Sequence, residues 1–68
     1  MGRKIDVDDL VSAAEIAVRF GVRRPQVVHD WVRRHPDFPQ PVYHSDRIRL
    51  WNWPDIENWG VKTGRLER

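Results

Sequence analysis

The chain has 68 residues, with 12 Lys and Arg against 10 Asp and Glu, and its formal net charge is +2. A chain of this length forms one small domain, because only about 60% of its unfolded surface can be buried on folding. The absence of cysteine excludes a disulfide framework and a thiolate metal site. No apolar run approaches the roughly 20 residues that a membrane span needs, and the polar start does not resemble a signal peptide, so we expect a cytoplasmic protein with no membrane partner.

We expect residues 1–68 to form a single domain whose ordered core spans about 10–60. Residues 1–9 are polar, which predicts a frayed arm, with contacts from Arg3 and Lys4 to DNA phosphates as the alternative.

The first helix is predicted to begin after Ser12, a good N-cap, with Glu15 at the capping-box spacing. Apolar residues recur at helical spacing as far as Phe20, and the small Ala17 would let a second helix cross closely. Gly21 follows at once, where a left-handed residue would end the helix.

A second helix is expected at about residues 25–34. Pro25 fits its first position, because the N–H group that proline lacks would be unpaired there anyway. Val28, Trp31 and Val32 recur at helical spacing and predict the buried side. Two helices joined by a turn that requires glycine indicate a helix-turn-helix, with a plain helical hairpin as the alternative.

The opposite side of the second helix carries a polar ridge, which consists of Gln26, His29 and Arg33. Glutamine can pair with adenine and arginine with guanine, so the ridge suits a DNA major groove. Asp30 flanks it and is expected to form a solvated pair with Arg34; accepting a hydrogen bond from cytosine is the alternative. The DNA-contact candidates here are Arg23, Arg24, Gln26, His29, Arg33 and Arg34.

Three prolines then exclude a helix at residues 36–41, and Phe38 is expected to fill the core from this loop. Two short strands are predicted at residues 41–44 and 47–51, joined by a turn at Ser45 and Asp46. Such a hairpin beside a helix-turn-helix is typical of a wing. Ile48 and Leu50 are expected to face the helices, with Trp51 on the other side. The hairpin's DNA-contact candidates are His44, Ser45, Arg47 and Arg49.

A third helix is expected to start with Pro54 at its first position and to end at Gly60. The tail beyond it is polar, and Lys62 and Arg65 in it could either contact DNA or be solvated. The four tryptophans are interpreted as core anchors, because an aromatic side chain buries about 150–250 Å². These residues are Trp31, Trp51, Trp53 and Trp59.

Charge is distributed unevenly along the chain. The stretch from Arg19 to Arg49 holds seven arginines and three aspartates, a net charge of +4, and no lysine. Arginine binds phosphate and guanine edges through paired hydrogen bonds. The acids gather nearer the ends, and this segregation is typical of a nucleic-acid-binding face.

The stretches LVSAAEIAVRFGV, HPDFPQPV and RIRLWNWPDIENW resemble the small MerR-like winged-helix family of excisionases and AlpA-like prophage regulators. The resemblance covers residues 10–66. It implies an α+β fold that is mostly α: a winged helix-turn-helix with three short helices and a two-stranded β-hairpin wing. It also implies a recognition helix carrying Arg24, Gln26, His29 and Arg33, with backbone contacts from Arg47 and Arg49.

One departure from the family pattern affects the second helix. Arg23 stands where many relatives have a Ser or Thr that caps this helix, and the spacing from Gly21 to Trp31 is one residue longer than usual. The register of the recognition helix is therefore open by one position.

The sequence predicts a non-catalytic, sequence-specific binder of double-stranded DNA that needs no cofactor and no metal. An excisionase-like protein would assist an integrase and associate cooperatively with further copies on DNA, whereas a regulator would occupy an operator. The alternative of another class is a protein-interaction adaptor with partly exposed tryptophans. An enzyme is disfavoured, because the sequence has no nucleophile elbow, P-loop or HExxH motif.

Overall fold

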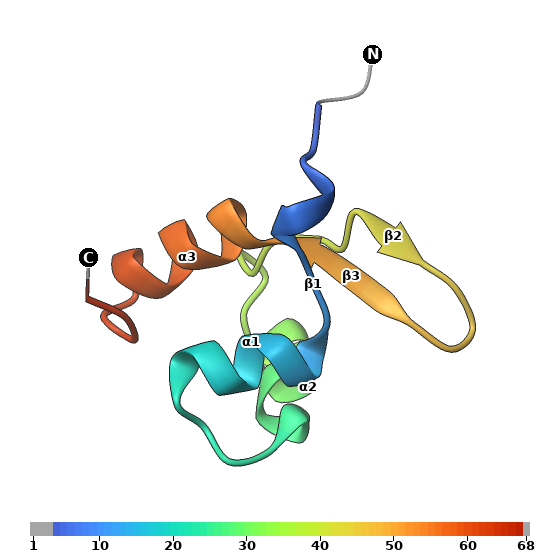
Figure 1. Cartoon of the computed structure of the whole chain (residues 1–68). Helices are drawn as coiled ribbons and strands as arrows, with labels where there is room; N and C mark the ends of the chain where they lie inside the picture. Colours follow the sequence, from blue (N-terminus) through green and yellow to red (C-terminus); the bar gives the residue numbers. More distant parts are fainter. Residues whose placement is uncertain (1–3, 68) are drawn as a thin grey trace.

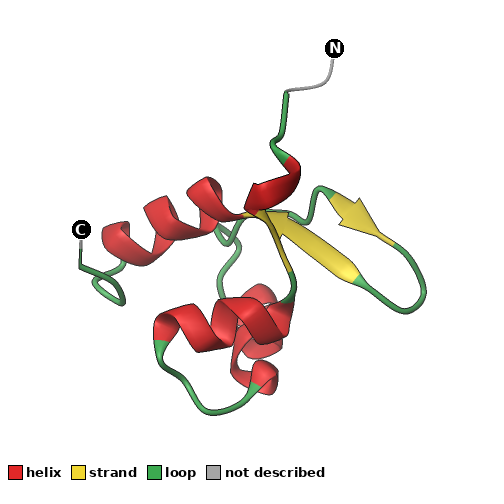
Figure 2. Ribbon diagram, in the orientation of Figure 1, coloured by secondary structure: helices red, strands yellow, loops and turns green. Residues whose placement is uncertain are grey.

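The computed structural model describes residues 4–67, which form a small α+β domain of three α-helices and a three-stranded antiparallel sheet (Figures 1 and 2). In chain order, the elements are the 3-10 helix η1 (Val7–Asp9), β1 (Leu10–Val11), α1 (Ala13–Phe20), α2 (Pro25–Arg34), β2 (Tyr43–His44), β3 (Arg49–Asn52) and α3 (Trp53–Lys62). In Figure 1, α1 and α2 lie below the sheet, α3 lies to one side, and the β2–β3 hairpin extends to the other.

The predicted frayed arm is partly structured. The carboxylate of Asp6 accepts a hydrogen bond from the backbone N–H of Asp8 at 3.0 Å and thereby caps η1. Lys4 is exposed, and Arg3 lies outside the described residues.

Local signals set the boundaries of α1 as predicted. The hydroxyl of Ser12 accepts a hydrogen bond from the backbone N–H of Glu15 at 3.3 Å. The carboxylate of Glu15 does not complete a capping box but accepts from Arg19 Nε at 3.1 Å. Gly21 is left-handed, with φ of 72°, and turns the chain towards α2.

The helix α2 has the predicted boundaries and the predicted buried side. Pro25 occupies its first turn, and Val28 is fully buried against the core that α1 shares. Trp31 and Val32 are half-buried against the same core. The two helices are therefore joined by a turn at Gly21 and pack against one shared core.

The sheet differs from the predicted two-stranded hairpin, because β1 adds a third strand. The strand order is β1-β3-β2, and Val11 in β1 pairs with Trp51 in β3. Two residues are too few to show a strand periodicity, so Leu10 and Val11 resembled only a helix entrance. The added strand fixes the hairpin to the chain segment that enters α1.

The predicted sides of β3 are inverted. Trp51 is fully buried and faces the helices, whereas Ile48 keeps 44% of its surface exposed. Burying the larger aromatic ring removes more apolar surface from water than burying Ile48. The indole Nε1 of Trp51 also donates to the backbone oxygen of Pro39 at 3.1 Å, so its polar atom is satisfied.

The helix α3 continues past Gly60, where its end was predicted. Gly60 is buried within the helix, and a Cβ atom there would lie 2.7 Å from side-chain atoms of Phe20 and of Leu66. This glycine therefore allows close packing and does not end the helix. Gly64, with φ of 78°, lies in the turn that follows.

Aromatic side chains fill much of the core, as predicted. Trp51 and Trp59 are buried, Trp31 and Trp53 are half-buried, and Phe38 is buried from the loop after α2. The interpretation of the tryptophans as core anchors is confirmed for the two buried ones and holds in part for the other two.

Candidate nucleic-acid interface

A cleft of about 540 Å³ brings the hairpin together with the starts of α1 and α2. It is lined by the first turn of α1, by α2 at Pro25 and His29, and by residues 44–49 of the hairpin together with Trp51. Five of the ten predicted contact residues line it, and they are His29, His44, Ser45, Arg47 and Arg49. Residues from two separate parts of the sequence thus share one concave surface.

The inverted side of β3 explains why the hairpin's cations lie at this cleft. Side chains alternate along a strand, so Arg49 lies on the same side of β3 as the buried Trp51. His44 is the direct cross-strand partner of Arg49, and Arg49 Nε donates to His44 Nε2 at 3.3 Å. Both side chains are exposed, so the pair is available to a ligand in the cleft.

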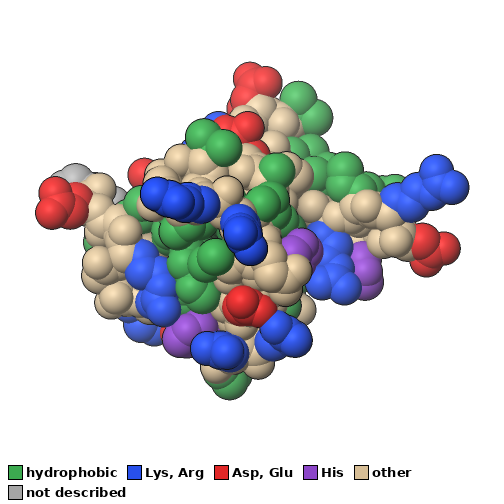
Figure 3. Space-filling model, turned by 90° about the horizontal axis from the view of Figure 1, so that it is seen from below, with side chains coloured by type: hydrophobic (Ala, Val, Ile, Leu, Met, Phe, Trp, Pro, Cys, Tyr) green, Lys and Arg blue, Asp and Glu red, His purple; other side chains and the backbone are tan. Residues whose placement is uncertain are grey.

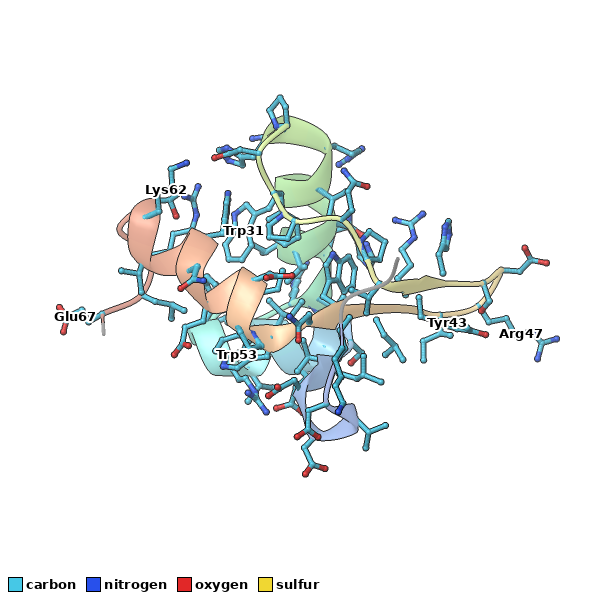
Figure 4. All side chains as sticks on the ribbon, turned by 90° about the horizontal axis from the view of Figure 1, so that it is seen from above. Trp31, Tyr43, Arg47, Trp53, Lys62 and Glu67 are labelled. Carbon is cyan, nitrogen blue, oxygen red and sulfur yellow. The ribbon has the colours of Figure 1, made fainter. Side chains whose placement is uncertain are left out.

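Ser45 has a structural role within the hairpin turn. Its backbone N–H donates to the oxygen of Ile48 at 2.8 Å, and its hydroxyl accepts from the N–H groups of Arg47 and Ile48 at 3.4 and 3.3 Å. The turn therefore spans residues 45–48 and is longer than the predicted pair. This closure leaves Arg47 at the tip, where Figure 4 shows its side chain pointing away from the domain.

The polar ridge of α2 is organised by one carboxylate oxygen. Asp30 Oδ1 accepts from Gln26 Nε2 at 3.4 Å and also from an Nη nitrogen of Arg33. The predicted partner of Asp30 was Arg34, so this prediction is wrong: the ion pair is with Arg33, three residues on. Gln26 and Arg33 are exposed, and His29 is half-buried beside the cleft.

The remaining predicted cations lie at the two ends of α2 and not in the cleft. Arg23 and Arg24 are exposed in the turn before α2, and Arg34 is exposed at its end. Arg24 occupies the N-cap position of α2 without a side-chain capping bond. The first turn of this helix therefore has no side-chain cap.

Basic side chains extend over the surface formed by the helices and the hairpin. Figure 3 shows Lys and Arg side chains spread across the face seen from below, with histidines among them, and a further cation on the projecting hairpin. One ion pair on this surface, between Asp30 and Arg33, also lowers the pKa of the Asp30 carboxyl, because Arg33 and then Gln26 donate hydrogen bonds to its ionised form.

No protein-family model, no curated protein and no solved structure matches this chain. Within residues 4–67, no group of three or more His, Asp or Glu side chains is placed to hold a metal ion. None of the helices described is long and apolar enough to cross a membrane.

Two features of this interface were missed from the sequence. The first turn of α1 lines the cleft through Ser12, Ala13 and Ala14, and only the third strand reveals how the hairpin approaches it. Asp30 also joins Gln26 to Arg33, although the i,i+3 and i,i+4 spacings were present in the sequence as a signal.

Proposed function

We propose that this protein binds double-stranded DNA sequence-specifically, with α2 in the major groove and the hairpin along the neighbouring backbone. The observation that best supports this proposal is the cleft that is lined both by His29 on α2 and by Arg47 and Arg49 on the hairpin. The proposal includes membership of the excisionase and AlpA-like winged-helix family, a cytoplasmic location, and no catalytic activity.

The side chains of the polar ridge on α2 and of the hairpin suit these two different contacts with DNA. The ridge on α2 offers an amide and a guanidinium at Gln26 and Arg33, the groups that pair with adenine and guanine edges. The hairpin offers arginines at a cleft that also includes the N-terminal turn of α1, and both features attract phosphate. Small-molecule pockets are instead mostly apolar, with few charged groups.

Binding should depend strongly on salt. About five phosphate contacts would give a slope of about −4 to −5 for the logarithm of affinity against the logarithm of salt concentration. Fluorescence anisotropy with labelled duplexes at several salt concentrations measures this slope. Arg47→Ala should weaken binding, whereas Lys62→Ala on α3 removes the same charge outside the cleft and serves as the matched control. An absence of binding to duplex DNA in dilute buffer would contradict the proposal.

Within this class, we place the excisionase-like role first and keep a small phage or prophage transcriptional regulator as the alternative, because the resembled family includes both. An excisionase-like protein would occupy several adjacent sites, bend the DNA and contact an integrase. A ladder of shifted complexes on attachment-site DNA, with bending, supports this role, and a single footprint over a promoter supports regulation.

A protein-interaction adaptor remains the second candidate, and one observation favours it. Tyr43 and Leu50 are direct cross-strand partners in the hairpin, and Ile48 lies in the turn just before β3. Tyr43 is 53% exposed and Ile48 is 44% exposed, so the hairpin offers apolar surface to a partner. Burial of Trp51 and Trp59 argues against an interface built on tryptophans. Blue-shifted tryptophan emission, which indicates buried rings, would disfavour this role, and red-shifted emission would favour it.

A further inference from the structure

We propose that Asp30 is a positioning residue that sets the sequence selectivity of α2 by holding Gln26 and Arg33 in one fixed arrangement. This inference rests on the proposed DNA-binding function and goes beyond it, because it assigns a role to an acidic residue on a surface meant for an anionic ligand. The single oxygen Oδ1 of Asp30 accepts hydrogen bonds from both neighbours.

Helix geometry places these three residues in one row. Gln26 and Arg33 are seven positions apart, so they lie about two turns and about 10 Å from each other on the same side of α2. Asp30 lies between them, four residues after Gln26 and three before Arg33. The carboxylate therefore lies between the two side chains and bonds to both of them.

The bond from Gln26 determines which way its amide faces. A carboxylate only accepts hydrogen bonds, so the Nε2 group of Gln26 must face Asp30 and its Oε1 must face away. One N–H and the carbonyl oxygen then remain for a base, and these are the two groups that a paired contact with adenine requires. Without Asp30, either orientation of the amide is accessible.

The ion pair has the same effect on Arg33. Its guanidinium uses one Nη nitrogen for Asp30 and keeps its other donors for a base edge. A long arginine side chain otherwise samples many rotamers, and an unpaired one can bind any phosphate within reach. The negative charge of Asp30 also repels phosphate, which weakens binding to DNA of the wrong sequence.

The charges that face Asp30 support a positioning role over a direct base contact. Arg33 and Gln26 donate to it, and Arg34 adds a further favourable charge interaction. A carboxylate whose oxygen already accepts from two side chains has less capacity to accept from a cytosine amino group. Its side chain is only 34% exposed, whereas that of Arg33 is 70% exposed, so Arg33 is the group presented to the ligand.

Affinity measurements on Asp30→Ala test this inference. The probes are a duplex that the wild-type protein enriches from a random-sequence library and a shuffled duplex of the same length. The sequence selectivity is the dissociation constant for the shuffled duplex divided by that for the preferred duplex. We expect this ratio to fall about tenfold, since each paired base contact contributes about that much discrimination or more. We also expect tighter binding to the shuffled duplex, with a salt slope steeper by about 0.9, because Arg33 is released to a phosphate.

Asp37→Ala is the matched control, because Asp37 carries the same charge but lies in the loop after α2 and not on the polar ridge. It should leave the ratio unchanged. Circular dichroism verifies that both variants keep their helices.

If Asp30→Ala keeps the wild-type ratio and slope while the wild type selects a sequence, the inference fails and the proposed function stands. If the variant loses preference at one cytosine without binding shuffled DNA more tightly, Asp30 reads a base directly and the positioning role is overturned. If the wild type enriches no sequence, both are overturned.

Discussion

The guanidinium carbon of Arg65 lies 4.7 Å from the ring centroid of Trp59, so the tail after α3 stacks on the core. The same carbon lies 5.3 Å from the ring of Trp31 in α2. An Nη nitrogen of Arg65 also lies 3.3 Å from Nε2 of His35, the C-cap residue of α2. One arginine in the tail therefore connects the buried end of α3 to the end of the proposed recognition helix.

Arg65→Ala should destabilise the domain by about 1–2 kcal/mol, because two cation–π contacts are lost together. Urea unfolding followed by tryptophan emission measures this change in the free energy of unfolding. Lys62→Ala removes an equal charge from an exposed position on α3 and should leave the free energy of unfolding nearly unchanged. Equal effects of the two substitutions would mean that the stacking of Arg65 contributes nothing.

Gly60→Ala should destabilise the domain by about 1–3 kcal/mol, because the new methyl group overlaps Phe20 and Leu66, both 2.7 Å away. Leu66→Ala in the same chain should recover part of this loss by removing one of the two clashes. Gly21→Ala is the informative comparison, since no atom lies within 4 Å of its Cβ position and only the left-handed backbone resists the change. Failure of Leu66→Ala to recover any stability would contradict the steric explanation.

The helices were predictable because short-range signals determine them. Ser12, Gly21 and Pro25 each act on the backbone next to them, and all three hold the predicted positions. The end of α3 was not predictable in this way. Gly60 resembles a helix stop in sequence, but the atoms that require a glycine there belong to Phe20 and Leu66.

The candidate site was predictable by residue type and not by arrangement. The polar side of α2 follows from helical periodicity, and it is exposed as expected at Gln26 and Arg33. The side of β3 that faces the helices depends on whether Trp51 or Ile48 is buried, which periodicity alone does not decide. His29 and the hairpin line the same cleft because Trp51, and not Ile48, is buried against the helices.

Arg33→Ala and Arg47→Ala should weaken DNA binding in different ways. We expect Arg33→Ala to cost about 1–3 kcal/mol on the preferred sequence and to relax the sequence preference, because a base contact is lost. Arg47→Ala should weaken binding to all duplexes alike and reduce the magnitude of the salt slope by about 0.9, because a phosphate contact is lost. Anisotropy titrations on preferred and shuffled duplexes separate the two effects. Intact sequence preference in Arg33→Ala would show that the groove-facing side of α2 is assigned wrongly.

The pKa of Asp30 should report its bonds to the ridge in the absence of DNA. Hydrogen bonds from Arg33, and to a lesser extent from Gln26, hold this pKa below its usual value. Arg33→Ala should therefore raise the pKa of Asp30 towards the usual value, and Gln26→Ala should raise it by less. A titration of the side-chain carboxyl carbon by NMR measures both shifts. An unchanged pKa in Arg33→Ala would mean that the ion pair does not form in solution.

The sign of this shift also predicts how stability depends on pH. Because the pKa of Asp30 is lower in the folded than in the unfolded state, its ionised form stabilises the fold at pH values above the unfolded-state pKa. This contribution is lost as the pH falls through the lowered folded-state pKa. Asp30→Asn should therefore be less stable than the wild type near neutral pH, and the difference should vanish in strong acid. Urea unfolding at both pH values checks this, and high salt should shrink the difference at neutral pH, since the pair is exposed to solvent.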